Sequence, residues 1–282
     1  MTRKIAVITG CSSGFGLLST LELARRGYTV VATMRDLARR GPLDEALAKT
    51  GLAEQVSVRT LDVALPASHQ PFVASVVADH GAIDLLINNA GFAVGGFAED
   101  VTLEELRRQF ETNFFGTVSL TKAVLPVMRR QRRGRIIMLS SIAGRSAAPA
   151  MSSYCASKFA LEGYTETLRH EMSPLGVDCI LIEPGSFETK IWYRAENVAA
   201  AASDPASPNQ QRTQSFRNYI QKQLKRADPA EVARLIAHLA DVPHPRLRYA
   251  IGRDAKLLLI LRALLPFSVF QRIVKRTLKL GG

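Results

Sequence analysis

The residues best suited to chemistry in this chain are Tyr154 and Lys158, which stand four positions apart. In a helix that begins near Ser152, this spacing places both side chains on one face, one turn apart. A phenol titrates near pH 10, and an adjacent ammonium favours its ionised form, so Lys158 should lower the pKa of Tyr154. The tyrosine could then exchange a proton with a substrate oxygen at neutral pH. Ser141 could hydrogen-bond the same oxygen. By itself, such a pair is more often a surface contact.

A glycine-rich turn near the N-terminus is a second candidate for binding chemistry. Gly10, Gly14 and Gly16 lie between an apolar strand at 4–9 and a helical pattern at 15–26. Such a turn lets backbone approach a pyrophosphate, to which the helix N-terminus offers N–H donors. The spacing is G-x-x-x-G-x-G, not G-x-G-x-x-G, so a purely structural turn is the alternative.

The same turn also satisfies G-x-S-x-G, the nucleophile elbow of α/β hydrolases, with Ser12 as nucleophile. That reading needs a later acid and a late histidine such as His238 or His244. It places the elbow on the first strand, however, so no earlier strand and loop could provide the second oxyanion donor. We therefore favour a dinucleotide-binding turn.

The surrounding elements alternate between apolar runs and helical stretches. The runs expected to be strands are 4–9, 29–33, 56–61, 84–87, 135–139 and 178–182, and Thr102 with Glu105 forms a capping box before a helix. This order predicts one α/β domain over 1–282, a Rossmann-like doubly wound parallel sheet with helices on both faces. Residues 197–215 lack periodicity, so we expect a mobile substrate lid at about 192–216.

The charge of +12 is concentrated in two places. Five arginines lie between 129 and 135, and residues 246–282 hold nine Lys/Arg against the single acid Asp254. Neither cluster has interleaved aromatic residues or a helix-turn-helix pattern, so we expect no nucleic-acid partner. The basic, apolar C-terminal segment at about 253–282 either packs on the core or makes peripheral contact with a membrane.

Several classes of protein are disfavoured by what the chain contains. No apolar stretch is long enough for a signal peptide or a transmembrane helix. Three scattered cysteines form no CxxC pair, and the five histidines show no ligand spacing, so neither a disulfide framework nor a metal site is expected. A cytoplasmic protein fits this usage of cysteine.

Taken together, the motifs resemble the short-chain dehydrogenase/reductase family over about residues 4–190. The matching residues are Thr9-Gly10-Cys11-Ser12-Ser13-Gly14-Phe15-Gly16, Asp62, Asn88-Asn89-Ala90-Gly91, Asn113, Ser140-Ser141, Tyr154-Cys155-Ala156-Ser157-Lys158 and Pro184-Gly185 followed by Thr189. Thr33-Met34-Arg35-Asp36 and the basic tail are most similar to the branch with 17-beta-hydroxysteroid and retinol dehydrogenases.

The resemblance implies an oxidoreductase that moves hydride between a nicotinamide and a ketone, aldehyde or alcohol, with a lipophilic, steroid- or retinoid-like substrate. It implies that Tyr154 is the acid/base, that Ser141 orients the substrate oxygen, and that Lys158 binds the nicotinamide ribose. Asn113 would hold a water in a proton path. The cofactor-binding residues expected are Gly10, Ser12, Ser13, Gly14, Phe15, Gly16, Arg35, Asp62, Val63, Asn89, Ala90, Gly91, Tyr154, Lys158, Pro184, Gly185, Phe187 and Thr189. For Asp62, a turn carboxylate is the alternative to an adenine contact.

The end of the second strand bears on which cofactor is used. An NAD enzyme carries an acid there for the ribose 2′-hydroxyl, whereas an arginine accommodates the 2′-phosphate. Met34 takes the acid's place and Arg35 follows, so NADP(H) is expected before NAD(H), although a small register shift would bring in Asp36. A homo-oligomer is also expected. The rival hypothesis is a catalytically idle NADP(H)-binding regulatory module, against which the intact Ser141, Tyr154 and Lys158 argue.

Overall fold

The computed structural model describes residues 3–189, 191, 198–218 and 226–277. Seven strands form one parallel sheet in the order β3-β2-β1-β4-β5-β6-β7, which confirms the predicted fold class. The strands are β1 (Ile5–Ile8), β2 (Thr29–Met34), β3 (Val56–Thr60), β4 (Leu85–Asn88), β5 (Gly134–Leu139), β6 (Val177–Pro184) and β7 (Arg248–Ile251).

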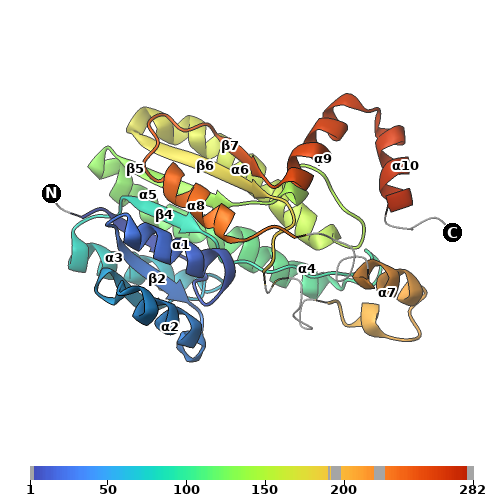
Figure 1. Ribbon diagram of the computed structural model, residues 1–282, viewed down its shortest axis with the longest axis horizontal. Helices are drawn as coiled ribbons and strands as arrows, with labels where there is room; N and C mark the ends of the chain where they lie inside the picture. The colour runs from blue at the N-terminus through green and yellow to red at the C-terminus, as the bar shows by residue number, and fades with distance from the viewer. Residues whose placement is uncertain (1–2, 190, 192–197, 219–225, 278–282) are drawn as a thin grey trace.

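Helices cover both faces of this sheet, as Figure 1 shows. They are α1 (Gly14–Arg25), α2 (Gly41–Thr50), α3 (His69–His80), α4 (Leu103–Phe110), α5 (Thr117–Gln131), α6 (Ser152–Met172), α7 (Gln210–Asn218), α8 (Ala230–Leu239), α9 (Arg253–Leu264) and α10 (Phe267–Thr277). The capping box predicted at Thr102 and Glu105 is present at the start of α4.

Alternation along the strands divides the core into two layers. In β1, Ala6 and Ile8 pack in one cluster with α1, α2 and α8, whereas Ile5 and Val7 pack in the other with α3, α5 and α6. Strands β1 and β4 are buried throughout, because successive side chains point to opposite faces and helices cover both faces. The order of the strands reverses between β1 and β4, so the loops after them diverge and leave a crevice at the carboxyl edge.

Two parts of the structure were not predicted. Strand β7 is short and only half-buried, and its pairing with β6 brings the chain back to the sheet before α9. The segment expected to lack structure contains a 3-10 turn (Ala201–Ser203) and α7, while its residues 192–197 lie outside the described residues. Polar side chains hold it in place: Ser207 donates to Asp100 at 2.8 Å and Asn209 to Glu99 at 2.7 Å. Apolar periodicity could not reveal such anchoring.

The last two helices are joined to the body at the start of α9. Asp254, in the first turn of α9, accepts a hydrogen bond from the Ser186 backbone at 2.7 Å, and Ala255 is buried. From there α9 and α10 extend away from the sheet layers, at the same end of the molecule as α7 (Figure 1).

Candidate active site

A cleft of about 1180 Å³ opens at the carboxyl edge of the sheet, where the topology predicts a binding crevice. Nearly all residues predicted for the site line it. They are Gly10, Ser12, Ser13, Gly14, Phe15, Arg35, Asp62, Val63, Asn89, Ala90, Gly91, Ser141, Tyr154, Pro184, Gly185, Phe187 and Thr189. Gly16, Asn113 and Lys158 do not line the cleft, and each lies behind a residue that does.

The loops after β1 and β4 are tied together at the floor of the cleft. The Thr9 hydroxyl accepts hydrogen bonds from the backbone N–H groups of Asn89 and Ala90, at 3.0 and 2.9 Å. The Asn89 side chain donates to the carbonyls of Thr9 and Gly10. Gly10 has φ +74°, and a Cβ there would lie 2.9 Å from the Ala90 Cα. Only glycine fits this close approach.

The N-terminus of α1 faces the cleft with its donors available. Ser13 is the N-cap in an extended conformation, and its side chain makes no capping hydrogen bond. Gly16 lies behind the turn, because a Cβ there would be 2.3 Å from the Gly10 carbonyl oxygen. An open helix N-terminus beside a glycine turn binds a phosphate group well. The residues present therefore fit a dinucleotide.

Two arginines stand at the end of the cleft beyond β2. Arg35 and Arg39 both line it, and so does Asp36, which lies between them in the chain. The Asp36 carboxylate caps a short turn by accepting from the Ala38 N–H at 2.9 Å, and it lies 3.7 Å from Arg39. Arg39 was missed by sequence reasoning, which considered only the positions next to the strand end. The carboxylate is thus already engaged by protein groups.

Asp62, after β3, has the local role that was the alternative to an adenine contact. Its carboxylate accepts from the Ala64 N–H at 3.0 Å, which forms a turn. The residue also lines the cleft, so the turn presents Asp62 and Val63 at the wall.

Helix α6 begins at the cleft and carries Tyr154 and Lys158 in its first two turns. The Lys158 ammonium is buried beneath the cleft, donates to the Leu139 carbonyl at 2.6 Å, and lies 5.8 Å from the centre of the Tyr154 ring. Burial lowers the pKa of Lys158 to about 8, which Glu162 opposes. The lysine therefore stays largely charged at neutral pH.

The pKa of Tyr154 differs from the sequence expectation. Burial raises it to about 12, and a hydrogen bond with Ser141 lowers it only in part. Lys158 is not among the groups that shift this pKa, and its ammonium instead donates to the Leu139 carbonyl. In this state the phenol is a proton donor.

Asn113 lies in a π-helical segment, Glu111–Gly116, between α4 and α5. Its side-chain oxygen accepts from the Phe92 N–H at 3.1 Å, and its nitrogen donates to the Phe92 carbonyl at 3.0 Å and to Ser157 at 3.3 Å. Asn113 thus joins the loop after β4 to α6. The segment ends at Gly116, where a Cβ would lie 2.1 Å from the Val63 carbonyl oxygen, so only glycine fits there.

A cluster of paired charges lies beside α6, away from the cleft. Glu162 accepts from Arg248 at 2.9 Å, and the buried Glu183 accepts from Arg145 at 3.0 Å and lies 3.5 Å from Arg248. Burial and the nearby Glu162 raise the pKa of Glu183. The cluster connects α6, the end of β6, β7 and the loop after Ser141. It was not predicted, since its members are far apart in the sequence.

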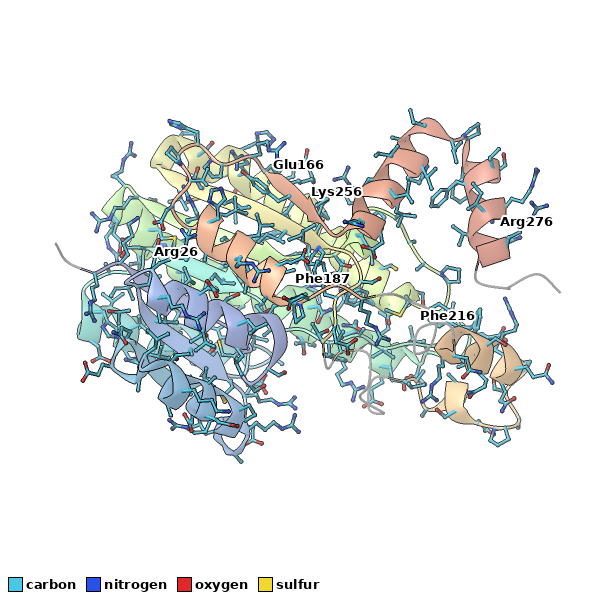
Figure 2. All side chains as sticks on the ribbon, viewed as in Figure 1. Arg26, Glu166, Phe187, Phe216, Lys256 and Arg276 are labelled. Atoms are coloured by element: carbon cyan, nitrogen blue, oxygen red, sulfur yellow. The ribbon has the colours of Figure 1, made fainter. Side chains whose placement is uncertain are left out.

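The cleft wall opposite the glycine turn is largely apolar. Its members come from loops and from the C-terminal half of the chain, and they are Phe92, Ile142, Met151, Ile191, Val198, Phe216, Leu258, Leu261, Phe270, Ile273 and Val274. Figure 2 labels Phe216 on α7 and Phe187 in the loop after β6. No histidine is among the described cleft residues, so Ser12 has no base there for the hydrolase chemistry.

Within the described ranges, no group of three or more His, Cys, Asp or Glu side chains is arranged to hold a metal ion. What the cleft presents is an anion-binding end, two arginines, and a partly buried phenol with a serine hydroxyl beside an apolar wall. This arrangement can bind a dinucleotide and deliver a proton to the oxygen of an apolar molecule.

Comparison with known proteins agrees with this chemistry. The short chain dehydrogenase family model matches residues 4–198. The uncharacterized oxidoreductase YusZ of Bacillus subtilis is 43% identical and covers 99% of both chains. The 3-ketodihydrosphingosine reductase of Bacteroides thetaiotaomicron is 41% identical over 67% of this chain and 66% of its own. Retinol dehydrogenase 8 of Bos taurus is 34% identical over 93% and 86%.

The chain is also similar to solved structures of short-chain dehydrogenases. A short-chain dehydrogenase from Streptomyces avermitilis is 31% identical, with a TM-score of 0.80 and coverage of 98% of each chain. A short-chain dehydrogenase/reductase from Burkholderia phymatum, in complex with NAD, is 27% identical, with a TM-score of 0.79 and 93% coverage of each chain. The predicted likeness to retinol and 17-beta-hydroxysteroid dehydrogenases is confirmed. The chain belongs to the short-chain dehydrogenase/reductase family and is an oxidoreductase acting on CH–OH donors.

Proposed function

We propose that this enzyme uses NADP(H) to reduce a lipophilic ketone or aldehyde, or to run the reverse oxidation. The observation that carries the proposal is the partly buried Tyr154, which lines the cleft beside Ser141 with the Lys158 ammonium beneath it. A phenol with a pKa raised to about 12 is protonated at neutral pH, so it has a proton to donate when a carbonyl is reduced.

The proposed roles follow from where each group stands. NADP(H), when bound, supplies the hydride. Tyr154 donates its proton to the substrate oxygen, and the Ser141 hydroxyl hydrogen-bonds the same oxygen and orients it. The buried charge of Lys158 stabilises the phenolate that is left. Asn113 holds the loop after β4 against α6, so that the cleft wall and the tyrosine keep their separation.

The lipophilic character of the substrate is proposed from the apolar wall. Side chains of α7, α9 and α10 add Phe216, Leu258, Leu261 and Phe270 to that wall. A site lined in this way gains affinity from apolar area removed from water. Relatives named for a ketosphingoid base and for retinol support the same class of substrate.

The preference for NADP(H) is proposed from charge. Arg35, Asp36 and Arg39 all line the cleft at the end of β2, and the Asp36 carboxylate caps its own turn. Charge-assisted hydrogen bonds from arginine suit a phosphate, and a ribose hydroxyl would need the carboxylate.

We also propose a cytoplasmic homo-oligomer, in which residues 192–216 act as a lid. All three cysteines are free and buried, as suits a reducing compartment. Phe115 and Phe159 are exposed on neighbouring elements, where a second copy could cover them. None of the described helices is long and apolar enough to cross a membrane.

The proposed proton donor is tested with Tyr154→Phe, which removes the hydroxyl and keeps the ring. Reduction of a lipophilic ketone should slow by about 10² to 10⁴, because general acid catalysis is lost. The affinity for NADPH, measured by fluorescence titration, should change little. Tyr164→Phe is the matched control, since this tyrosine lies on the same helix outside the cleft. Normal turnover by a folded Tyr154→Phe enzyme would refute the role.

The cofactor preference is tested with Arg35→Ala. A hydrogen bond to a charged group contributes about 1.5 to 3 kcal/mol, so the ratio of kcat/KM for NADPH over NADH should fall by about 10-fold or more. Arg40→Ala is the control, because Arg40 pairs with Asp44 and does not line the cleft. If the wild-type enzyme uses NADH equally well, the proposed preference is wrong.

A further inference from the structure

The C-terminal helices present apolar residues on two different sides. Leu258 and Leu261 of α9 and Phe270, Ile273 and Val274 of α10 line the cleft. A second set on α9 does not line it and is open to solvent. This outer stripe consists of Leu257, Ile260 and Leu264, which are 57%, 54% and 75% exposed.

The spacing of the outer stripe makes it one continuous surface. Leu257, Ile260 and Leu264 stand at i, i+3 and i+7, which is one side of a helix. Phe267, 61% exposed, begins α10 directly after the turn. Scattered exposed apolar residues are ordinary, whereas an exposed row of them marks an interaction surface.

After Asp254, which is engaged by the Ser186 backbone, the charges on these two helices have a single sign. Residues 255–277 contain five cations, Lys256, Arg262, Arg272, Lys275 and Arg276, and no acid. Arg262 stacks on Phe267 and Phe270, and the other four make no ion pair in the described part of the chain. On α10, Arg272 and Arg276 are one turn apart, beside the partly exposed Val269 and Ile273. Arg276 lies on the side of α10 away from the sheet (Figure 2).

We propose that the outer stripe and the α10 cations dock on an anionic bilayer surface, and that α9 and α10 thereby hold the mouth of the cleft against the lipid. Amphipathic helices bind such surfaces with apolar side chains about 5–10 Å deep in the interface and Lys/Arg at the headgroups. The part of the proposal that concerns delivery of substrate from the lipid rests on the proposed function.

A second copy of this chain is a poorer occupant. A two-fold interface places the same patch on both subunits, so Arg272, Lys275 and Arg276 would approach their own counterparts. With no acid in residues 255–277, nothing in the patch offsets that repulsion. An anionic headgroup layer supplies the missing opposite charge.

Docking is tested by sedimentation of the full-length protein with vesicles of phosphatidylcholine alone or mixed with phosphatidylglycerol. The wild-type protein should bind the anionic vesicles, less so at high salt, and bind neutral vesicles much more weakly. Arg272→Glu/Arg276→Glu should weaken binding by about 10-fold or more. Leu257→Gln/Ile260→Gln/Leu264→Gln should do the same.

Two matched control variants distinguish a specific docking site from non-specific binding through net charge or exposed apolar side chains. Arg129→Glu/Arg130→Glu makes the same charge change at the end of α5, at the opposite edge of the sheet from the cleft. Leu65→Gln/Leu103→Gln removes exposed leucines outside these helices. Both should bind anionic vesicles as the wild type does. Equal losses in the controls, or no binding by the wild type, would overturn the proposal.

Oligomeric state and turnover complete the test. Sedimentation velocity should give the same species for the wild type and the leucine-to-glutamine triple variant. If that variant instead dissociates an oligomer, the stripe is a subunit interface and the proposal fails. Turnover of a small water-soluble ketone should be unchanged in the docking variants, whereas a ketone carried in vesicles should be reduced more slowly. A variant that loses vesicle binding but turns over the water-soluble ketone normally would support the docking role. A wild-type enzyme that turns over neither ketone would contradict the proposed function instead.

Discussion

The molecule carries charge in two ways, at the catalytic helix and at the C-terminal helices. Behind α6, Glu162 and Glu183 are buried and matched by Arg145 and Arg248. On α9 and α10, exposed cations stand beside exposed leucines, and the described residues give Lys256, Arg272, Lys275 and Arg276 no acidic partner. Charge removed from water must be paired to be tolerated, whereas charge in water can be left for a partner. The paired charges behind α6 therefore fix the position of that helix. The exposed cations of α9 and α10 are instead suited to binding a partner.

The largest effect that tests this comparison is expected from Arg248→Met. It leaves Glu162 and Glu183 close together without their shared cation, and breaking a buried pair costs about 3 kcal/mol or more. Urea unfolding at pH 7.5 measures the loss, which should shrink at pH 5 because a carboxyl that becomes protonated no longer repels its neighbour. Arg234→Met is the control, since Arg234 lies 3.9 Å from Asp228 in an exposed pair. Equal losses in both variants would show that burial does not distinguish them.

An effect of opposite sign is expected from Lys158→Met. The pKa of Lys158 is lowered to about 8 in the folded chain, so the unfolded chain binds more protons between about pH 8 and 10.5. Wild-type stability should therefore rise over that window, and the charge should cost stability below it. The variant removes this cost but also loses the hydrogen bond to Leu139. The net effect should be a variant that is more stable at pH 7 by on the order of 1–2 kcal/mol.

The gain from Lys158→Met should disappear by pH 10.5, and turnover should be severely reduced at every pH. Urea midpoints at pH 7 and pH 10 measure the first effect. A variant that is less stable at pH 7 would show that the buried ammonium stabilises the fold, contrary to this account.

The smallest effect is expected at the C-terminal helices. Arg272→Glu/Arg276→Glu should change the free energy of unfolding by about 0.5 kcal/mol or less, because exposed unpaired residues contribute little to stability. Thermal unfolding without vesicles measures this. A loss of stability comparable to that of Arg248→Met would mean that α9 and α10 belong to the core. The two regions would then not differ in how their charges contribute to stability.

Local patterns were enough to identify the sheet and most of the cleft. Strands alternating with helices predicted the doubly wound fold, because connections of that length return the chain to a parallel neighbour. The glycine turn, Tyr154 and Ser141 follow strand ends or a helix start, and carboxyl ends of parallel strands share one edge. Strand β7 escaped because four half-buried residues carry little apolar signal. Helix α7 escaped because hydrogen bonds to Glu99 and Asp100 help hold its segment.

The sequence by itself determined the family of the fold, the phenol and ammonium one helical turn apart, and the arginine after β2. Only the tertiary structure decided the environment of those groups. The pKa of Tyr154 rises because packing removes it from water, and Lys158 donates to the Leu139 carbonyl because the end of β5 lies within hydrogen-bond reach of it. Desolvation and charge pairing depend on neighbours that are distant along the chain, such as Arg248 and Glu183. Spacing can bring two residues together, but it cannot say what else surrounds them.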